Sequence, residues 1–103
     1  MNPLPIDLQS RIEALYVHLD VTIPDSPGSG VDGFAPVLEH IKERGGVFLI
    51  KWDGQRQSRH YTAVVLHPEM EAFRIDDHTI ELATAKTILA FADAVLDFPN
   101  GKP

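Results

Sequence analysis

The chain has 103 residues, no cysteine and a formal net charge of −6, with 44% hydrophobic and 23% charged residues. This composition is typical of a globular protein, and the length suffices for one domain with a single modest core. The lack of cysteine excludes disulfides and thiolate chemistry. The acidic balance argues against binding to nucleic acid or to an anionic membrane surface.

The chain shows no membrane-spanning or secretory segment. No apolar run approaches the roughly 20 residues that a membrane helix needs. The residues after Met1 also lack the basic and apolar regions of a secretory signal. We therefore expect a cytoplasmic protein with a single domain over residues 1–103, frayed ends at 1–6 and 99–103, and a long loop at 20–33.

The first predicted element is a helix over residues 7–19, in which apolar residues recur at helical spacing on one stripe. Asp7 is the expected N-cap of this helix. Residues 21–33 contain two prolines, three glycines and two serines, which predicts a loop that is either functional or mobile. Its acidic character comes from Asp20, Asp25 and Asp32.

A second helix is predicted over residues 34–44, with a glycine pair after it that can take the C-cap conformation. Residues 47–52 then form a strand that is largely apolar on both faces, a pattern typical of interior strands. The return strand is predicted over 60–67. A loop over about 53–59 would place Ile50 opposite Thr62 and Phe48 opposite Val64, which fits the apolar pattern better than a tight turn.

The rest of the chain predicts a turn at 69–71, a short strand over 72–76 and a final alanine-rich helix from 81 or 84 to 97. The element order is α-α-β-β-β-α. The connections between the strands are too short for parallel crossovers. The sequence therefore predicts an α+β fold with a three-stranded antiparallel sheet packed against helices on one face, or partly on both.

Few residues indicate chemistry. The five histidines show no metal-binding spacing, and we expect no metal, cofactor or catalytic residues. The strand that begins at His60, followed by a strand that ends in Asp76, resembles the histidine and orienting acid of papain-like folds. Those enzymes need a nucleophilic cysteine, which this chain lacks. An inactive papain-like relative is therefore one alternative, and activity as an enzyme is not expected.

Three short motifs carry a resemblance to a known family. They are Lys-Trp-Asp-Gly-Gln-Arg at 51–56, Tyr-Thr-Ala-Val-Val at 61–65 and Phe-Arg-Ile-Asp at 73–76, followed by the alanine-rich helix. Together they resemble small bacterial immunity proteins, which are encoded beside polymorphic toxins of contact-dependent or type VI secretion systems. The resemblance spans about residues 45–95. It implies a non-enzymatic antitoxin that binds a cognate toxin in the producer's cytoplasm and blocks the toxin's active site.

An acidic inhibitor suits a toxin with a basic active-site cleft, because carboxylates can mimic an anionic substrate. The residues expected at the contact lie at one end of the sheet: Trp52, Asp53, Arg56, Arg59, Glu69, Glu71, Asp76 and Asp77. The loop with Asp20, Asp25 and Asp32 is the second candidate surface. Charge reversal at Asp76 and Asp77 is expected to weaken toxin binding and to leave folding intact.

Two interpretations compete with this one. The first is that Asp53, Arg74 and Asp76 form an internal salt-bridge set that holds the hairpin, so that the motif residues are structural. The second is that the protein is a binding or scaffold module, or a homodimer, with no toxin partner. The activity of the toxin also stays open: nuclease, NAD-consuming enzyme, ADP-ribosyltransferase or another.

Overall fold

The computed structural model describes residues 4–55, 57–58, 60–68 and 70–96. Its elements follow the order α1 (Ile6–Leu19), η1 (Asp32–Phe34), α2 (Ala35–Glu43), β1 (Val47–Trp52), β2 (Tyr61–His67), β3 (Met70–Asp77) and α3 (Ile80–Val95). The three strands form one antiparallel sheet with β2 in the middle. The predicted fold class and element order are therefore confirmed.

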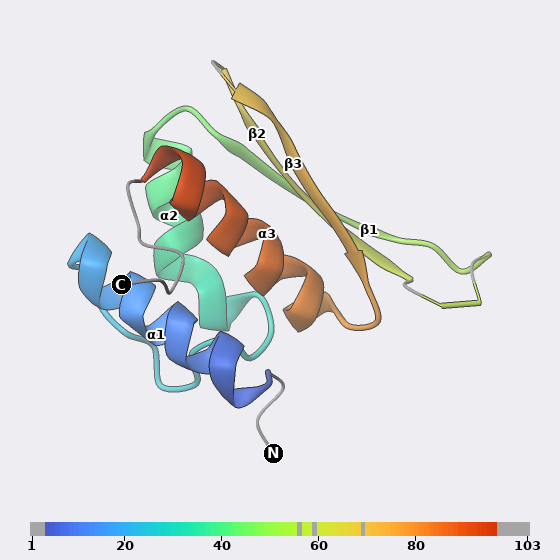
Figure 1. The fold of residues 1–103 in the computed structure, drawn as a ribbon, viewed down its shortest axis with the longest axis horizontal. Helices are drawn as coiled ribbons and strands as arrows, with labels where there is room; N and C mark the ends of the chain where they lie inside the picture. Colours follow the sequence, from blue (N-terminus) through green and yellow to red (C-terminus); the bar gives the residue numbers. More distant parts are fainter. Residues whose placement is uncertain (1–3, 56, 59, 69, 97–103) are drawn as a thin grey trace.

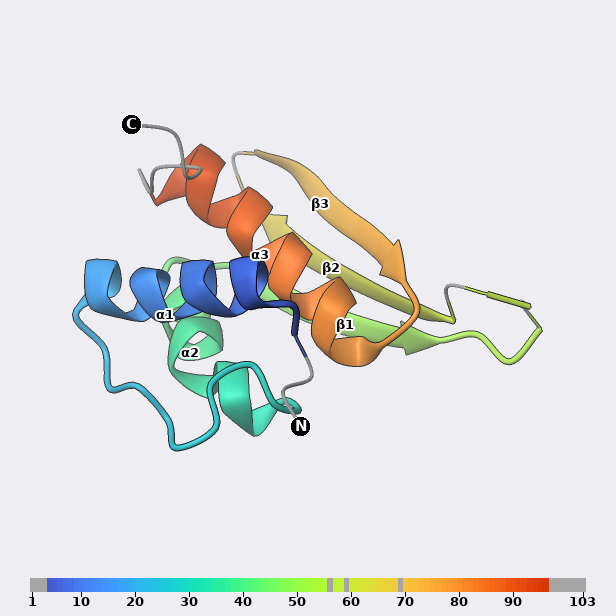
Figure 2. The same ribbon diagram turned by 60° about the horizontal axis from the view of Figure 1, so that its bottom comes forward.

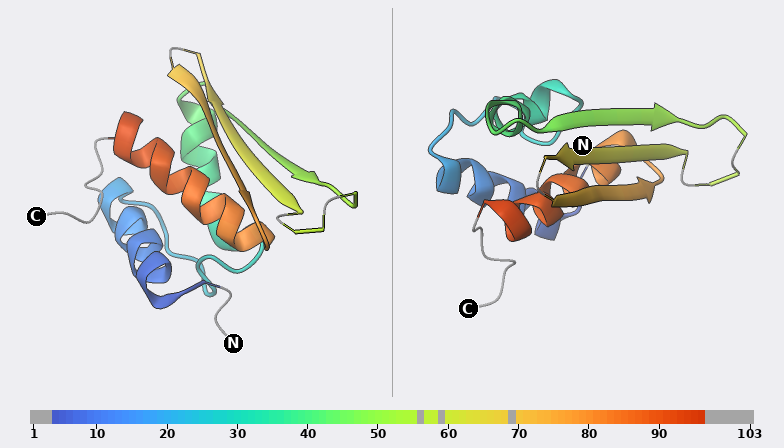
Figure 3. Two further views of the ribbon diagram at one scale, coloured as in Figure 1. Left: turned by 45° about the vertical axis from the view of Figure 1, so that its right-hand side comes forward. Right: turned by 90° about the horizontal axis from the view of Figure 1, so that it is seen from above.

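The molecule has a helical side and an open side (Figure 1). α3 packs against β2 and β3, and α2 packs against β1. α1 lies on the side of α2 and α3 that faces away from the sheet, as the left-hand view of Figure 3 shows. The helices thus cover one face of the sheet and leave the other, which we call the bare face, without a helical layer.

The core lies between the sheet and the helices. α3 buries eight of its residues there, and small side chains such as Ala85 and Ala92 let it approach the sheet closely. The core cluster consists of Leu4, Ile12, Leu15, Tyr16, Phe34, Val37, Ile41, Val65, Ala85, Ile88, Leu89, Phe91, Ala92 and Leu96. Among the described helices, none has the length and apolar character that a bilayer crossing demands.

The ends of the helices differ in detail from the prediction. α1 begins at Ile6 after Pro5, so Asp7 lies in the first turn and is not the N-cap. Leu4 is buried in the core, so ordered structure begins before the predicted end of the frayed segment at residue 6. The predicted end of the last helix at Asp97 and the tail at 99–103 lie outside the described residues.

The position of β1 corrects two expectations. β1 is an edge strand, not an interior one, because β2 is its only partner in the described part of the chain. Its pairing is also one residue off the prediction, since Ile50 lies opposite Ala63 and Phe48 opposite Val65. The shift places Ala63 and Val65 on the helix-covered face, where both are buried, and leaves Val64 on the bare face.

The turn between β2 and β3 is tighter than predicted. β3 begins at Met70, so Met70 and Glu71 belong to the strand and not to a turn at 69–71. His67 pairs with Met70, and the register shifts by one residue between Val65 and His67. Such a bulge adds local twist, which turns the end of the hairpin away from a flat edge.

Candidate binding surface at the hairpin end

Trp52 lies at the end of β1, where the strand extends past the helices (Figure 3). Its side chain is on the helix-covered side of the sheet, but it is 61% exposed because the helical layer stops short of it. Tyr61 pairs with Trp52 across the strands, and the two rings meet edge to face with centroids 6.1 Å apart. This contact orients the Trp52 ring, most of which is exposed to solvent.

Asp53 shapes the loop that follows Trp52. Its backbone N–H donates to the carbonyl oxygen of His60 at 2.7 Å, which closes the loop. One ring nitrogen of His60 lies 3.2 Å from the carbonyl oxygen of Asp53. The Asp53 carboxylate accepts a hydrogen bond from the N–H of Gln55, an interaction that stabilises a turn. We define the hairpin-end surface as Trp52, Asp53, His60 and Tyr61.

Asp76 lies on the bare face opposite Thr62. Its carboxylate accepts a hydrogen bond from the Thr62 hydroxyl at 2.5 Å and lies 3.5 Å from the Nε of Arg74. The Arg74–Asp76 pair agrees with part of the internal salt-bridge set that the sequence suggested. Asp76 therefore has a structural role within the sheet, and its carboxylate faces away from the side on which Trp52 lies.

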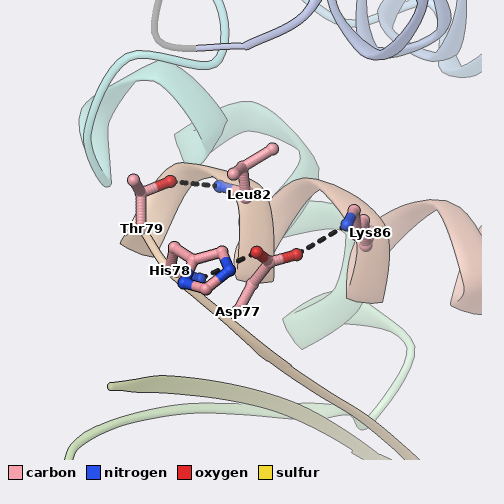
Figure 4. A network of polar contacts seen from close by, with 5 residues as sticks. All are labelled: Asp77, His78, Thr79, Leu82 and Lys86. Atoms are coloured by element: carbon pink, nitrogen blue, oxygen red, sulfur yellow. Dashed lines mark hydrogen bonds and ion pairs between the residues drawn. The ribbon is translucent and has the colours of Figure 1, made fainter. Parts of the chain in front are cut away.

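Asp77 points the other way, toward α3 (Figure 4). It is 7% exposed. Its carboxylate accepts hydrogen bonds from the Nζ of Lys86 at 2.6 Å and from the N–H of His78 at 2.7 Å. Burial alone would raise the pKa of Asp77. The hydrogen bonds from Lys86 and His78, with the positive charge of Lys86, outweigh burial and lower this pKa below its ordinary value.

The acidic segment predicted at 69–77 does not form one contact surface. Asp76 and Asp77 are neighbours in an extended strand, so their side chains lie on opposite faces of the sheet. Glu71 has its backbone in β3, but its side chain, like the whole of Glu69, Arg56 and Arg59, lies outside the described residues. Of the predicted set, Trp52 and Asp53 belong to the hairpin-end surface. Asp77 is buried and links β3 to α3.

The sequence analysis missed Thr79 as the N-cap of α3. Its hydroxyl accepts a hydrogen bond from the N–H of Leu82 at 3.0 Å, which satisfies one free donor of the first helical turn (Figure 4). The signal was present, because a threonine stands directly before the helical pattern. The cap and the Asp77–Lys86 pair together fix the start of α3 against the end of β3.

The second candidate surface, the loop between α1 and α2, is anchored at several points. Figure 2 shows it running back along α1 to the start of α2. The Tyr16 hydroxyl donates to the carbonyl oxygen of Gly33, and the Gln9 side-chain amide donates to that of Pro27 at 2.9 Å. The N–H of Gly30 donates to Glu81 at the start of α3, 3.1 Å away. These contacts join the loop to α1 and to α3.

The three acids of this loop do not converge. Asp20 is the C-cap of α1 and takes the left-handed conformation, with φ of 56°. Asp20 lines a depression of about 450 Å³ together with Glu39 and Glu43 of α2. Asp25 and Asp32 line a separate depression of about 230 Å³. Glu39 and Glu43 were missed by the sequence analysis, although their i, i+4 spacing puts them on one helix face.

The described residues also bear on chemistry. Among them, no three histidine or carboxylate side chains are grouped closely enough to hold a metal ion. The two groups of the papain-like interpretation are engaged in local structure, His60 with the Asp53 backbone and Asp76 with Thr62. Comparison with known proteins gave no match to any family model, curated protein or solved structure.

Proposed function

We propose that this protein is a bacterial immunity protein that neutralises a cognate secreted toxin by stoichiometric binding in the cytoplasm and blocks the toxin's active site. Two lines of evidence support the proposal. The motifs around residues 51–56, 61–65 and 73–76 resemble this family. The structure adds a hairpin end with an exposed aromatic side chain at the first of those motifs.

The observation that carries the proposal is the exposure of Trp52. A tryptophan that is 61% exposed at the end of a projecting hairpin leaves a large apolar surface in water. Tryptophan is among the residues that contribute most to binding energy when a partner covers them. Because Tyr61 already orders the ring, little side-chain entropy is lost when the partner binds.

Charge supplies the second part of the argument. The net charge of −6 favours encounter with a basic partner, and electrostatic attraction of this kind raises the association rate more than the final affinity. Asp53 follows Trp52 in the chain, so the hairpin end carries a carboxylate as well as an aromatic anchor. We propose that this pair enters a cleft lined by cationic groups, such as one that binds an anionic substrate. An interface of this kind buries about 1,200–2,000 Å² in total.

The test is a calorimetric titration against the purified product of the adjacent gene. The wild-type protein should bind it at a one-to-one ratio of chains. Trp52→Ala should weaken binding by a factor of about 30 or more, since a central aromatic anchor contributes at least about 2 kcal/mol. Trp52→Phe should retain much of the affinity. Val17→Ala, at an apolar site on α1 that is 70% exposed, is the matched control and should bind like the wild type.

Folding of each variant is checked by circular dichroism and by its unfolding midpoint. Trp52 contributes little to the core and loses only its cross-strand contact with Tyr61, so Trp52→Ala should unfold within about 1 kcal/mol of the wild type. Absence of binding by the wild-type protein would overturn the proposed function. Tight binding that Trp52→Ala leaves unchanged would overturn the assignment of the hairpin-end surface.

A further inference from the structure

The outer edge of β1 offers hydrogen-bonding groups to another strand. The N–H of Asp53 bonds to His60, which marks these two residues as a hydrogen-bonded pair of the antiparallel ladder. Such pairs alternate along the strands. Lys51, Leu49 and Val47 therefore direct their backbone groups toward β2. The backbone N–H and C=O groups of Phe48, Ile50 and Trp52 point to the free edge.

This edge has few of the features that prevent strands from pairing. β1 contains no proline and no register shift, and Lys51 is its only charged residue. Its bare-face side chains Val47 and Leu49 are 49% and 51% exposed. Edge strands of soluble monomers are usually short, charged, bulged or covered. An apolar edge of this length, without a bulge or a proline, is typical of a strand that has a partner.

We propose that this partner is a second copy of the chain, paired antiparallel through β1, with the Leu49 residues of the two copies facing each other at the dyad. The two sheets then form one continuous six-stranded sheet. The inference does not rest on the toxin proposal, because it is argued from the outer edge of β1 alone.

Two conditions select the register. The helix-covered faces of the two copies lie on the same side of the joined sheet only when even-numbered residues pair with even-numbered ones and odd with odd. The two residue numbers of each pair then sum to an even number, because alternate residues occupy opposite faces. The outward backbone groups of Phe48 and Ile50 meet their counterparts only under the same condition. With Leu49 at the dyad, Phe48 of one copy lies opposite Ile50 of the other, and both belong to the helix-covered face.

Charge and burial choose among the even registers. Centring on Leu49 places Lys51 opposite Val47, so the two ammonium groups do not meet and both exposed valines are covered. Centring on Ile50 would place Val47 opposite Asp53, an apolar side chain beside a carboxylate. Centring on Lys51 would bring two like charges together, which destabilises a cross-strand pair. The strand is thus self-complementary around Leu49, which favours a second copy over an unrelated strand.

The first test is sedimentation velocity of the purified full chain over a range of concentrations. The wild type should shift from monomer to dimer as the concentration rises. Leu49→Lys and Leu49→Glu should each stay monomeric, because like charges then face each other at the dyad. Ala72→Lys adds the same charge on the bare face of β3, away from the dyad, and should dimerise like the wild type. Leu49 is half exposed, so its variants should fold.

Mixing the two charged variants tests the register itself. Equal amounts of Leu49→Lys and Leu49→Glu should form a heterodimer, since opposite charges then meet across the dyad. If Leu49→Glu dimerises alone, the glutamate has met Lys51, and the Leu49-centred register is wrong. Dimerisation of Leu49→Lys to the same extent as the wild type would exclude β1 as the interface.

A crosslink provides a readout that does not depend on charge. The chain has no cysteine, so Leu49→Cys introduces a single thiol. Facing residues in a non-hydrogen-bonded pair have Cβ atoms about 4.5–5.5 Å apart, close to disulfide geometry. Mild oxidation should therefore give a covalent dimer for Leu49→Cys and much less for Ala72→Cys. A wild-type chain that stays monomeric at all concentrations would overturn the proposal. If the outward β1 amides then become protected from hydrogen exchange only after the adjacent gene's product is added, the partner is a foreign strand.

Discussion

The Nζ of Lys86 on α3 lies 2.6 Å from the carboxylate of Asp77 at the end of β3, and this ion pair fixes the last helix to the sheet. The Asp77 side chain is 10% exposed, whereas that of Lys86 is 44% exposed. A change at Lys86 would leave the largely buried Asp77 carboxylate without its cation, and a change at Asp77 would remove the carboxylate itself. This geometry gives Asp77 a role in stability and leaves little of its carboxylate exposed for the predicted toxin contact.

Asp77→Asn should lower the free energy of unfolding at pH 7 by about 1–3 kcal/mol, since it removes a charge-assisted hydrogen bond. The pKa of Asp77 is lowered in the folded protein, so its contribution is complete above the unfolded value of about 4 and is lost as the pH falls through the folded value. The gap between variant and wild type should therefore close in acid. Urea unfolding at a series of pH values measures it.

Asp93→Asn is the matched control for Asp77→Asn. Asp93 pairs with Arg11 at 3.1 Å, but both side chains are about one-third exposed. Exposed pairs of this kind contribute about 0–1 kcal/mol. Equal losses for the two variants at neutral pH would contradict the role given to the Asp77–Lys86 pair.

Tyr16 should make the protein sensitive to alkali. Burial raises the pKa of Tyr16 to about 12. The unfolded chain ionises near pH 10, so between about pH 10 and pH 12 it releases a proton that the folded protein keeps, and stability falls. Tyr16→Phe should lack this share of the fall. At neutral pH it should lose about 1–3 kcal/mol, because the Gly33 carbonyl loses the buried Tyr16 hydroxyl and keeps the N–H of Gly28 as a donor. Denaturant unfolding at neutral and alkaline pH separates the two effects.

Gly33 should tolerate no larger residue. A Cβ atom at this position would lie 2.6 Å from the carbonyl oxygen of Ser26 and 2.8 Å from the backbone nitrogen of Gly28. These backbone atoms belong to the hydrogen-bonded loop, so they cannot move aside without breaking it. Gly33→Ala should destabilise the protein by about 1–3 kcal/mol. Thermal unfolding gives the value.

Gly54 provides the comparison for Gly33. A Cβ atom at Gly54 would meet no heavy atom within 4 Å. Gly54→Ala should therefore stay within about 0.5 kcal/mol of the wild type. If Gly33→Ala were equally mild, the loop would have another way to accommodate the side chain, and the close packing described for it would be wrong.

Local patterns predicted the elements well, because each is marked by its own residues. The glycine pair before Val47 and the turn signal after Trp52 set the bounds of β1 as observed. Register and strand order depend on contacts between distant segments. The hydrogen bond from the Asp53 N–H to His60 closes the loop, and every β1–β2 pair is then one residue away from the predicted register. The residue pattern of a single strand does not indicate which residue of the next strand lies opposite.

The candidate site was predicted only in part for the same reason. Asp76 and Asp77 look equivalent in a run of acids, but the alternation of a strand sends one to Thr62 and the other to Lys86. β1 was expected in the interior because both of its faces are apolar. The structure places it at the edge, where Val47 and Leu49 are half exposed and belong to the proposed dimer surface.

The most direct test of the central claim is growth of bacterial cells that express the product of the adjacent gene. Co-expression of the wild-type protein should restore growth, and Trp52→Ala, at equal abundance, should restore it poorly or not at all. Val17→Ala should protect like the wild type. Failure of the wild-type protein to protect against a product shown to be toxic would contradict the assignment as an immunity protein.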